Sequence, residues 1–286
     1  MKKRKVVVVG ANGYLGGEIY KSLKSHSEFG DVISVSRHPG ADYFCDLSST
    51  SIQVPSLGKG DVVFFSAAVS SPDLCEDPFG AAYQTNVVGT IAFIGKAIEA
   101  GARVIFFSSD TVYGEQKEPF DESLPVNPFG GYAKMKSIVE THFANSELVK
   151  SIRLSYVFSK NDKFTKYLLC CEKEVEVFDP LIRSVIHIKD VLAGTLALAK
   201  QWNQTPHKYI NFGGPESISR QTMFLHISDY KSLELRHKLI TPDEKFYQNR
   251  PKAIAMRSPV LEKLLHRPPR SLLEACQAEF GFSKFQ

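Results

Sequence analysis

Three side chains in the middle of the chain have the types and spacing of a proton-transfer site. Ser109 follows an apolar run, and Tyr132 and Lys136 lie four residues apart behind a Gly-Gly pair. Residues four apart share one face of a helix, so the phenol and the ammonium can point into one pocket. Both groups are among those that serve as general acids and bases. The stretch is therefore a candidate for acid–base chemistry.

The Tyr-x-x-x-Lys spacing is not specific by itself. The chain has three other such pairs, which are Tyr20/Lys24, Tyr113/Lys117 and Tyr156/Lys160. For any one pair, a solvated helix face is the simpler interpretation. The context distinguishes Tyr132 and Lys136, because an apolar strand ends at the serine and a dinucleotide fingerprint lies upstream.

That fingerprint is a glycine-rich turn between a buried strand and a helix. Residues 5–9 are a β-branched run, and a helix is expected to follow the turn to about residue 25. The first glycine permits a tight turn, the second lets the backbone approach a pyrophosphate, and the third allows close helix packing. The spacing is G-x-x-G-x-x-G rather than G-x-G-x-x-G. We expect this turn to bind a dinucleotide cofactor through Gly10, Gly13, Tyr14, Leu15 and Gly16.

The end of the second strand predicts which dinucleotide is preferred. NAD binders usually carry an acidic residue here for the adenosine ribose, about 20 residues past the glycines. This chain has Ser36 and Arg37 instead. A hydroxyl and a guanidinium suit a 2′-phosphate, so NADP, as NADPH, is favoured over NAD. The alternative for Arg37 is an ordinary surface position.

Further cofactor contacts are expected after the third and fourth strands. Asp46 and Leu47 either cap the next segment or lie against the adenine. Ala67 and Ala68 are small, so a cofactor can pass over the strand ends there. Asn86 lies inside an expected helix at residues 79–100, as either a residue near the site or an ordinary buried amide.

Strands and helices alternate through the first half of the chain, which predicts an α/β fold with a Rossmann doubly wound parallel sheet. The segment at 115–129 has three prolines and is expected to be an ordered loop. We assign residues 1–157, plus about 184–213, to an NADP-binding domain. Residues 158–183 and 214–286 form the expected smaller, mixed α/β substrate-binding domain. A crevice between the two is the expected place for a ligand.

Bulk composition excludes several classes of protein. The chain has 286 residues, 43% of them hydrophobic, and a net charge of +4, which is ordinary for a soluble globular protein. Five cysteines without a C-x-x-C motif suggest neither disulfides nor a metal site. The basic run at 2–5 is interpreted as solvated, so no nucleic-acid partner is expected. No apolar run approaches the ~18 residues of a membrane span, so no membrane partner is expected. We expect a cytoplasmic protein, with a homodimer left open.

Six motifs occur in the order of a known family. They are GANGYLG, NVVGT, SSDTVYG, YAKMK, the segment 183–190 (RSVIHIKD) and Arg250-Pro251 with a later LEKL. With them the chain resembles the extended short-chain dehydrogenase/reductases, in the nucleotide-sugar branch near the dTDP-4-dehydrorhamnose reductases. The resemblance implies that Ser109 binds the substrate carbonyl, Tyr132 is the acid and Lys136 is its partner.

The same resemblance implies substrate contacts from Asp110 and two arginines. Arg183 and Arg250 match positions that hold the diphosphate in relatives, which suits charge-assisted bonding of phosphate by arginine. The related 4,6-dehydratases carry Asp-Glu where this chain has Asp110-Thr111, which argues against dehydration. Thr111 also replaces the cysteine of some combined epimerase–reductases. Ser159-Lys160 departs from the usual Gly-Pro.

The resulting hypothesis is NADPH-dependent reduction of a keto group on a nucleotide-activated 6-deoxy sugar. We expect the charge of Lys136, with that of the oxidised cofactor, to lower the pKa of Tyr132. One alternative is an NAD(P)-dependent nucleotide-sugar 4-epimerase with the same three residues. Another is a non-catalytic, NADP-binding regulatory subunit.

Overall fold

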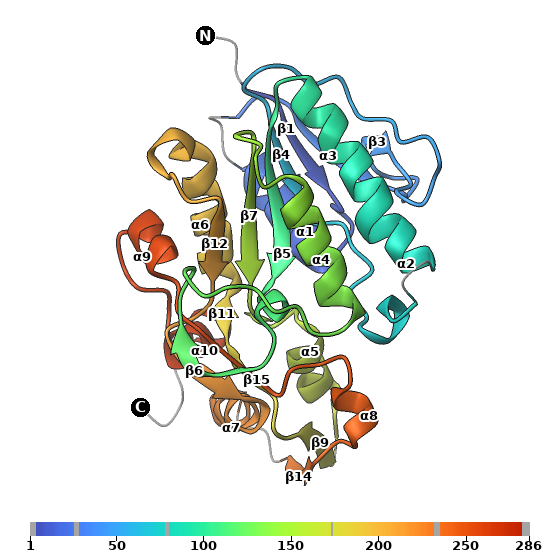
Figure 1. Ribbon diagram of the computed structural model, residues 1–286. Helices are drawn as coiled ribbons and strands as arrows, with labels where there is room; N and C mark the ends of the chain where they lie inside the picture. The colour runs from blue at the N-terminus through green and yellow to red at the C-terminus, as the bar shows by residue number, and fades with distance from the viewer. Residues whose placement is uncertain (1–3, 26–28, 78–79, 173, 232–234, 282–286) are drawn as a thin grey trace.

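A seven-stranded parallel sheet forms the centre of the molecule (Figure 1). The computed structural model describes residues 4–25, 29–77, 80–172, 174–231 and 235–281. The sheet order is β12-β7-β5-β4-β1-β2-β3. Its strands are β1 (Val6–Val9), β2 (Val32–Ser36), β3 (Tyr43–Phe44), β4 (Val62–Phe65), β5 (Arg103–Ser109), β7 (Val149–Leu154) and β12 (Tyr209–Phe212). The predicted doubly wound α/β fold is confirmed.

The sequence of β1 explains its central place. All four of its valines are buried, with β2 on one side and β4 on the other. Val6 and Val8 point into one core cluster, and Val7 and Val9 into the other. A strand that is apolar at every position can only be buried on both faces.

Helices cover both faces of the sheet. Helices α1 (Tyr14–Lys24), α6 (Ile188–Lys200) and α9 (Pro259–Leu265) share the core cluster of one face. The other face is covered by α3 (Thr90–Glu99) and α4 (Gly131–His142). Short α2 (Ala81–Tyr83) continues through a π-helical turn, Gln84–Gly89, into α3. The helix expected at 79–100 is therefore present with a π-helical interruption.

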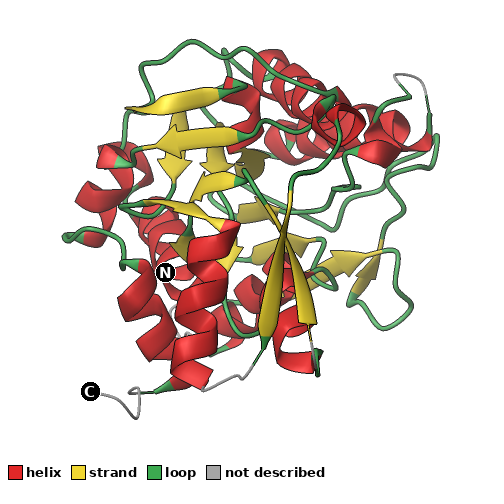
Figure 2. Ribbon diagram, turned by 90° about the horizontal axis from the view of Figure 1, so that it is seen from below, coloured by secondary structure: helices red, strands yellow, loops and turns green. Residues whose placement is uncertain are grey.

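Segments that follow β7, together with β6 from the first half of the chain, form smaller sheets near the carboxyl ends of the long strands (Figure 1). One has the order β13-β10-β15-β6, and two are two-stranded, β11-β8 and β14-β9. Their strands are β6 (Gln116–Phe120), β8 (Val157–Phe158), β9 (Glu174–Phe178), β10 (Ile182–Ser184), β11 (Ile186–His187), β13 (Ser217–Ser219), β14 (Arg236–Ile240) and β15 (Ala253–Met256). The helices here are α5 (Lys163–Cys170), α7 (Arg220–Lys231), α8 (Glu244–Tyr247) and α10 (Leu272–Phe280). Figure 2 shows this part of the molecule from below.

The prediction of a loop throughout residues 115–129 was wrong. Strand β6 lies within it and pairs in parallel with β15. Pro119 fits because β6 is an edge strand, where a missing amide donor is tolerated. The pairing partner lies far along the chain, so no local pattern signals it. The proposed division into two domains stays a prediction.

Candidate active site

The glycine-rich turn packs tightly against the chain around it and leaves the first turn of α1 uncapped. Gly10 has φ +87°, and a Cβ there would lie 2.7 Å from the backbone nitrogen of Ala67. A Cβ on Gly16 would lie 2.2 Å from the carbonyl oxygen of Gly10. Gly13 is the N-cap of α1 and provides no capping side chain, so backbone N–H groups of the first turn can meet an anion. These residues fit a dinucleotide pyrophosphate.

Tyr14 and Leu15, the two other residues of this turn that were predicted to bind the cofactor, have side chains that contact other parts of the protein. The hydroxyl of Tyr14 lies 2.7 Å from Oγ of Ser159, across from the loop after β8. Leu15 packs its side chain against the core shared by α1 and α6. Tyr14 therefore borders the ligand pocket described below, whereas only the backbone of Leu15 is available near the turn.

The residues at the end of β2 lie beside the glycine turn. Ser36 donates a hydrogen bond from Oγ to Oδ1 of Asn12, at 2.6 Å. Arg37 is exposed, and its charge acts on Asp46, whose pKa is lowered chiefly by hydrogen bonds from Ser48. Asp46 caps the turn after β3, because its Oδ1 accepts a hydrogen bond from the backbone nitrogen of Ser48 at 3.0 Å. Contact of Asp46 and Leu47 with an adenine stays a prediction.

The small residues after β4 are held by a buried amide. Asn86 accepts a hydrogen bond from the backbone of Val69 at 2.8 Å and donates another to its carbonyl at 2.9 Å. It thereby fixes the segment that follows Ala67 and Ala68. Asn86 supports the site's backbone and does not line the pocket that holds the predicted catalytic residues.

The three predicted catalytic residues come together. Ser109 ends β5, and Tyr132 and Lys136 lie one turn apart on α4. A pocket of about 630 Å³ at the strand ends is lined by both Ser109 and Tyr132. The Lys136 ammonium is buried, donates to the carbonyl oxygen of Phe107 at 2.8 Å and lies 5.7 Å from the centre of the Tyr132 ring.

Burial sets the protonation of this pair. It lowers the pKa of Lys136 to about 8, although the negative charge of Glu140 favours the ammonium. It raises the pKa of Tyr132 above its ordinary value, and Cys75 and Asp110 add to that effect. In the protein chain alone, burial raises the pKa of Tyr132, so the expected lowering by Lys136 together with the oxidised cofactor stays a prediction. Tyr132 therefore keeps the proton that an acid must donate.

We expect kcat/KM to fall as the pH rises through about 8. Below that pH Lys136 is charged, and above it the ammonium beside Tyr132 is lost, because burial has lowered its pKa from 10.5. The measurement is kcat/KM of the wild type against pH, which reports groups of the free enzyme. A flat profile across pH 8 would contradict this role of Lys136.

Asp110 lies between Ser109 and Arg183 and contacts both. The Ser109 hydroxyl lies 3.2 Å from Oδ1 of Asp110, while Ser155 donates to Oδ2 at 2.9 Å. Nε of Arg183 lies 3.8 Å from the same Oδ2. Burial raises the pKa of Asp110, and the charge of Arg183 opposes the shift. The predicted substrate residues Asp110 and Arg183 thus lie next to the catalytic serine.

Arg250 also lines this pocket, but it is engaged by another side chain. Its guanidinium binds both carboxylate oxygens of Asp73, at 2.9 and 2.6 Å. Its hydrogen bonds lower the pKa of Asp73 to about 2. The carboxylate occupies the fork-shaped donor set that a phosphate would use. A diphosphate bound by Arg250 must therefore displace Asp73.

Sequence reasoning missed several pocket residues. Ser108 has a buried hydroxyl without a hydrogen-bond partner, although it borders the pocket. Ser155, Tyr156 and Arg220 line it from the second half of the chain. The serine pair in SSDTVYG could have signalled Ser108. Arg220 has no such motif, because its place depends on residues distant in sequence.

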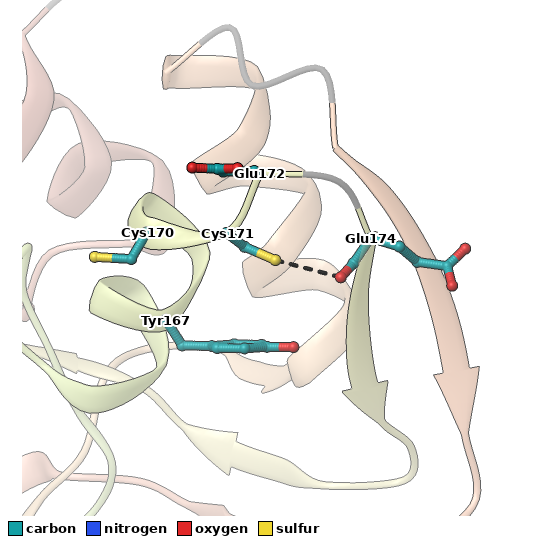
Figure 3. A pocket seen from close by; sticks show the side chains of 5 residues that line it. All are labelled: Tyr167, Cys170, Cys171, Glu172 and Glu174. Carbon is teal, nitrogen blue, oxygen red and sulfur yellow. Dashed lines mark hydrogen bonds between the residues drawn. The ribbon is translucent and has the colours of Figure 1, made fainter.

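A second pocket, of about 440 Å³, lies at the end of α5 (Figure 3). It is lined by Tyr167, Cys170, Cys171, Glu172 and Glu174. The two thiols point to opposite sides, and Cys171 donates to the Glu174 carbonyl oxygen at 3.3 Å. They are therefore not arranged as a pair that grips one ligand. Among the described residues, no cluster of three or more metal-ligating side chains occurs.

Comparison with known proteins places this geometry in a family. The profile of the NAD dependent epimerase/dehydratase family matches residues 6–213, from β1 to just past β12. The chain belongs to this family. This confirms the resemblance to the extended short-chain dehydrogenase/reductases and makes the protein an NAD(P)-dependent oxidoreductase of that type.

Relatives of this epimerase/dehydratase-family protein have different named roles. Methionine adenosyltransferase 2 subunit beta of Xenopus tropicalis is 25% identical over 84% of this chain and 76% of its own length. The dTDP-4-dehydrorhamnose reductase of Burkholderia thailandensis is 30% identical, over 60% of this chain and 57% of its own. Identity is higher with the reductase, but coverage is larger with the subunit.

Solved structures share the fold of this family member. A dTDP-4-dehydrorhamnose reductase of Clostridium acetobutylicum superposes with a TM-score of 0.78 at 22% identity, covering 96% of this chain and 98% of its own. A UDP-galactose 4-epimerase gives a TM-score of 0.76 at 21% identity, with 97% of both chains covered. In the part of this chain that the structure describes, no helix has both the length and the apolarity of a membrane span.

Proposed function

We propose that the protein is an NADPH-dependent reductase of a keto group on a nucleotide-activated 6-deoxy sugar. The observation that carries the proposal is one pocket at the carboxyl ends of the sheet strands. It brings Ser109 and Tyr132 together with Arg183 and Arg250. Ligands of open α/β sheets bind at this edge. A reductase relative and solved neighbours with bound UDP-sugars and NAD support this substrate class.

Each catalytic residue then has a defined task. When bound, NADPH supplies a hydride for the sugar carbon. Tyr132, protonated because it is buried, gives its proton to the former carbonyl oxygen. The Ser109 hydroxyl hydrogen-bonds that oxygen while negative charge builds on it. Lys136, fixed by the Phe107 carbonyl, stabilises the phenolate that remains.

Turnover of nucleoside-diphosphate keto sugars tests the proposal. NADPH absorbance is followed with a panel of 4-keto-6-deoxy sugars linked to dTDP, UDP or GDP. The parent sugars without a keto group are the matched controls. We expect consumption of NADPH with at least one keto sugar and with no control. Consumption with none of the keto sugars would contradict the reductase.

Replacing Arg37 with alanine should reduce the preference for NADPH. The exposed guanidinium at the end of β2 is the proposed partner of the 2′-phosphate, and a charge-assisted hydrogen bond contributes about 1.5–3 kcal/mol. We expect Kd for NADPH to rise about tenfold or more, with Kd for NADH unchanged. Calorimetry with both dinucleotides measures this. Equal binding of NADH and NADPH by the wild type would refute the assignment.

A second candidate is a subunit role within a larger complex. It is favoured by relatives named methionine adenosyltransferase 2 subunit beta, which cover up to 91% of this chain. In this role the chain binds NADP but catalyses no reaction, so the activity of the complex does not depend on the phenol of Tyr132. An intact biological activity in Tyr132→Phe would favour the subunit over the reductase.

A 4-epimerase is the remaining alternative, favoured by the fold neighbours named as epimerases. It oxidises and then re-reduces one carbon, so the cofactor is not consumed. Interconversion of two nucleotide sugars without loss of NADPH would select it.

A further inference from the structure

Arg220 is a third arginine of the pocket, and its guanidinium has unusual surroundings. It is the first residue of α7 and lies 3.8 Å from the centre of the Tyr156 ring and 4.8 Å from that of Phe164. Two aromatic rings thus hold the flat cation in place. A ligand that binds this guanidinium would cause little further loss of side-chain entropy, because the side chain is already ordered.

The other two pocket arginines already have oxygen partners. Arg183 donates to the carbonyls of Ile182 and Pro251, at 2.7 and 2.8 Å, and lies beside Asp110. Arg250 is bound by Asp73. Arg220 differs, because the side-chain hydrogen bonds of its guanidinium within the described ranges go to uncharged partners, which are Sδ of Met223, at 3.6 Å, and the hydroxyl of Tyr156. A thioether is a weak acceptor.

Among the described residues, neither of the two carboxylates that line the pocket forms an ion pair with Arg220. Asp162 accepts hydrogen bonds from the Tyr156 hydroxyl, from Thr165 Oγ1 and from backbone amides that it caps at the start of α5. Asp110 is engaged by two serines and Arg183. Burial lowers the pKa of Arg183, and the nearby charge of Arg220 adds to that effect. Two like charges beside one pocket favour an anionic ligand.

We propose that Arg220 binds an anionic oxygen group of the substrate, with Tyr156 and Phe164 as its supports. The group is the diphosphate of the nucleotide. A carboxylate carried by the sugar is the alternative that the test separates, since a 6-deoxy sugar has none at C6. This inference rests on the proposed function, because it assigns a further residue to the same substrate pocket. No sequence motif marks Arg220, because the guanidinium and its two rings come from separate segments of the chain.

Calorimetric titration of variants tests the inference without requiring turnover. Arg220→Met keeps most of the aliphatic contact with the rings and removes the charge. Arg220→Lys keeps the charge and loses the flat fork. Arg236→Met is the matched control, because Arg236 is exposed on β14 and lies outside the pocket. Thermal unfolding of each variant establishes that the fold is intact.

The ligands separate the two sources of negative charge. They are UDP, dTDP, inorganic pyrophosphate, a UDP-hexose and the corresponding UDP-hexuronic acid. A diphosphate contact predicts that Arg220→Met raises Kd for all of them about ten- to a hundredfold. A carboxylate contact predicts the same rise for the hexuronic acid only. Arg220→Lys should retain part of the affinity, and Arg236→Met all of it.

Two results would overturn the inference in different ways. Unchanged Kd values in a folded Arg220→Met, with a wild type that binds nucleoside diphosphates, would refute the role of Arg220 and leave the proposed function standing. A folded wild type that binds none of these ligands would refute both.

Discussion

Tyr132→Phe is expected to lower kcat by about 10²–10⁴-fold, the range typical of a positioned general acid. Phenylalanine keeps the ring in its place on α4 and removes only the hydroxyl that donates the proton. Binding of NADPH should be nearly unchanged. The measurements are single-turnover rates for chemistry and calorimetry for the cofactor.

Tyr167→Phe is the control for this prediction, because Tyr167 lies on α5 in the second pocket (Figure 3). Its rates should equal those of the wild type. If Tyr132→Phe retained full kcat, the phenol would not be the proton donor.

The second large effect is on stability and comes from a buried ion pair. Arg153 on β7 binds Glu140 on α4 at 2.8 Å, and their side chains are 5% and 3% exposed. Arg153→Met leaves the Glu140 carboxylate buried without its partner, which costs about 3–5 kcal/mol. The free energy of unfolding, measured with urea, should fall by that amount.

The double variant Arg153→Met/Glu140→Gln separates the ion pair from the packing. It removes both charges, so it should recover at least half of the loss of the single variant. Some loss should remain, since Arg153 also donates to the hydroxyl of Tyr113 at 2.8 Å. A double variant less stable than Arg153→Met would mean that charge burial is not the cause.

The parts of the fold and of the site that could be predicted from the sequence depend on short local patterns. The run of valines in β1 and the glycines after it are short, contiguous signals whose physical consequence does not depend on distant residues. The same holds for Tyr132 and Lys136, which share a helix face by spacing alone.

The features that could not be predicted depend on contacts between residues far apart in the sequence. Asp73 binds Arg250 across 177 positions, and β6 finds its partner in β15. Arg220 takes its place from rings on other segments. The pKa of Tyr132 follows from burial, which the spacing of Tyr132 and Lys136 does not reveal. In each case the deciding neighbour is set by the fold.

We propose net hydride transfer to a nucleotide-linked keto sugar at the pocket of Ser109 and Tyr132. Its most direct test is mass spectrometry of the product formed with NADPH that carries deuterium in the transferred position. We predict that the sugar gains one deuterium for each NADPH consumed, and that Tyr132→Phe forms this labelled product about 10²–10⁴-fold more slowly. An unlabelled product, or an epimer formed without consumption of NADPH, would contradict it.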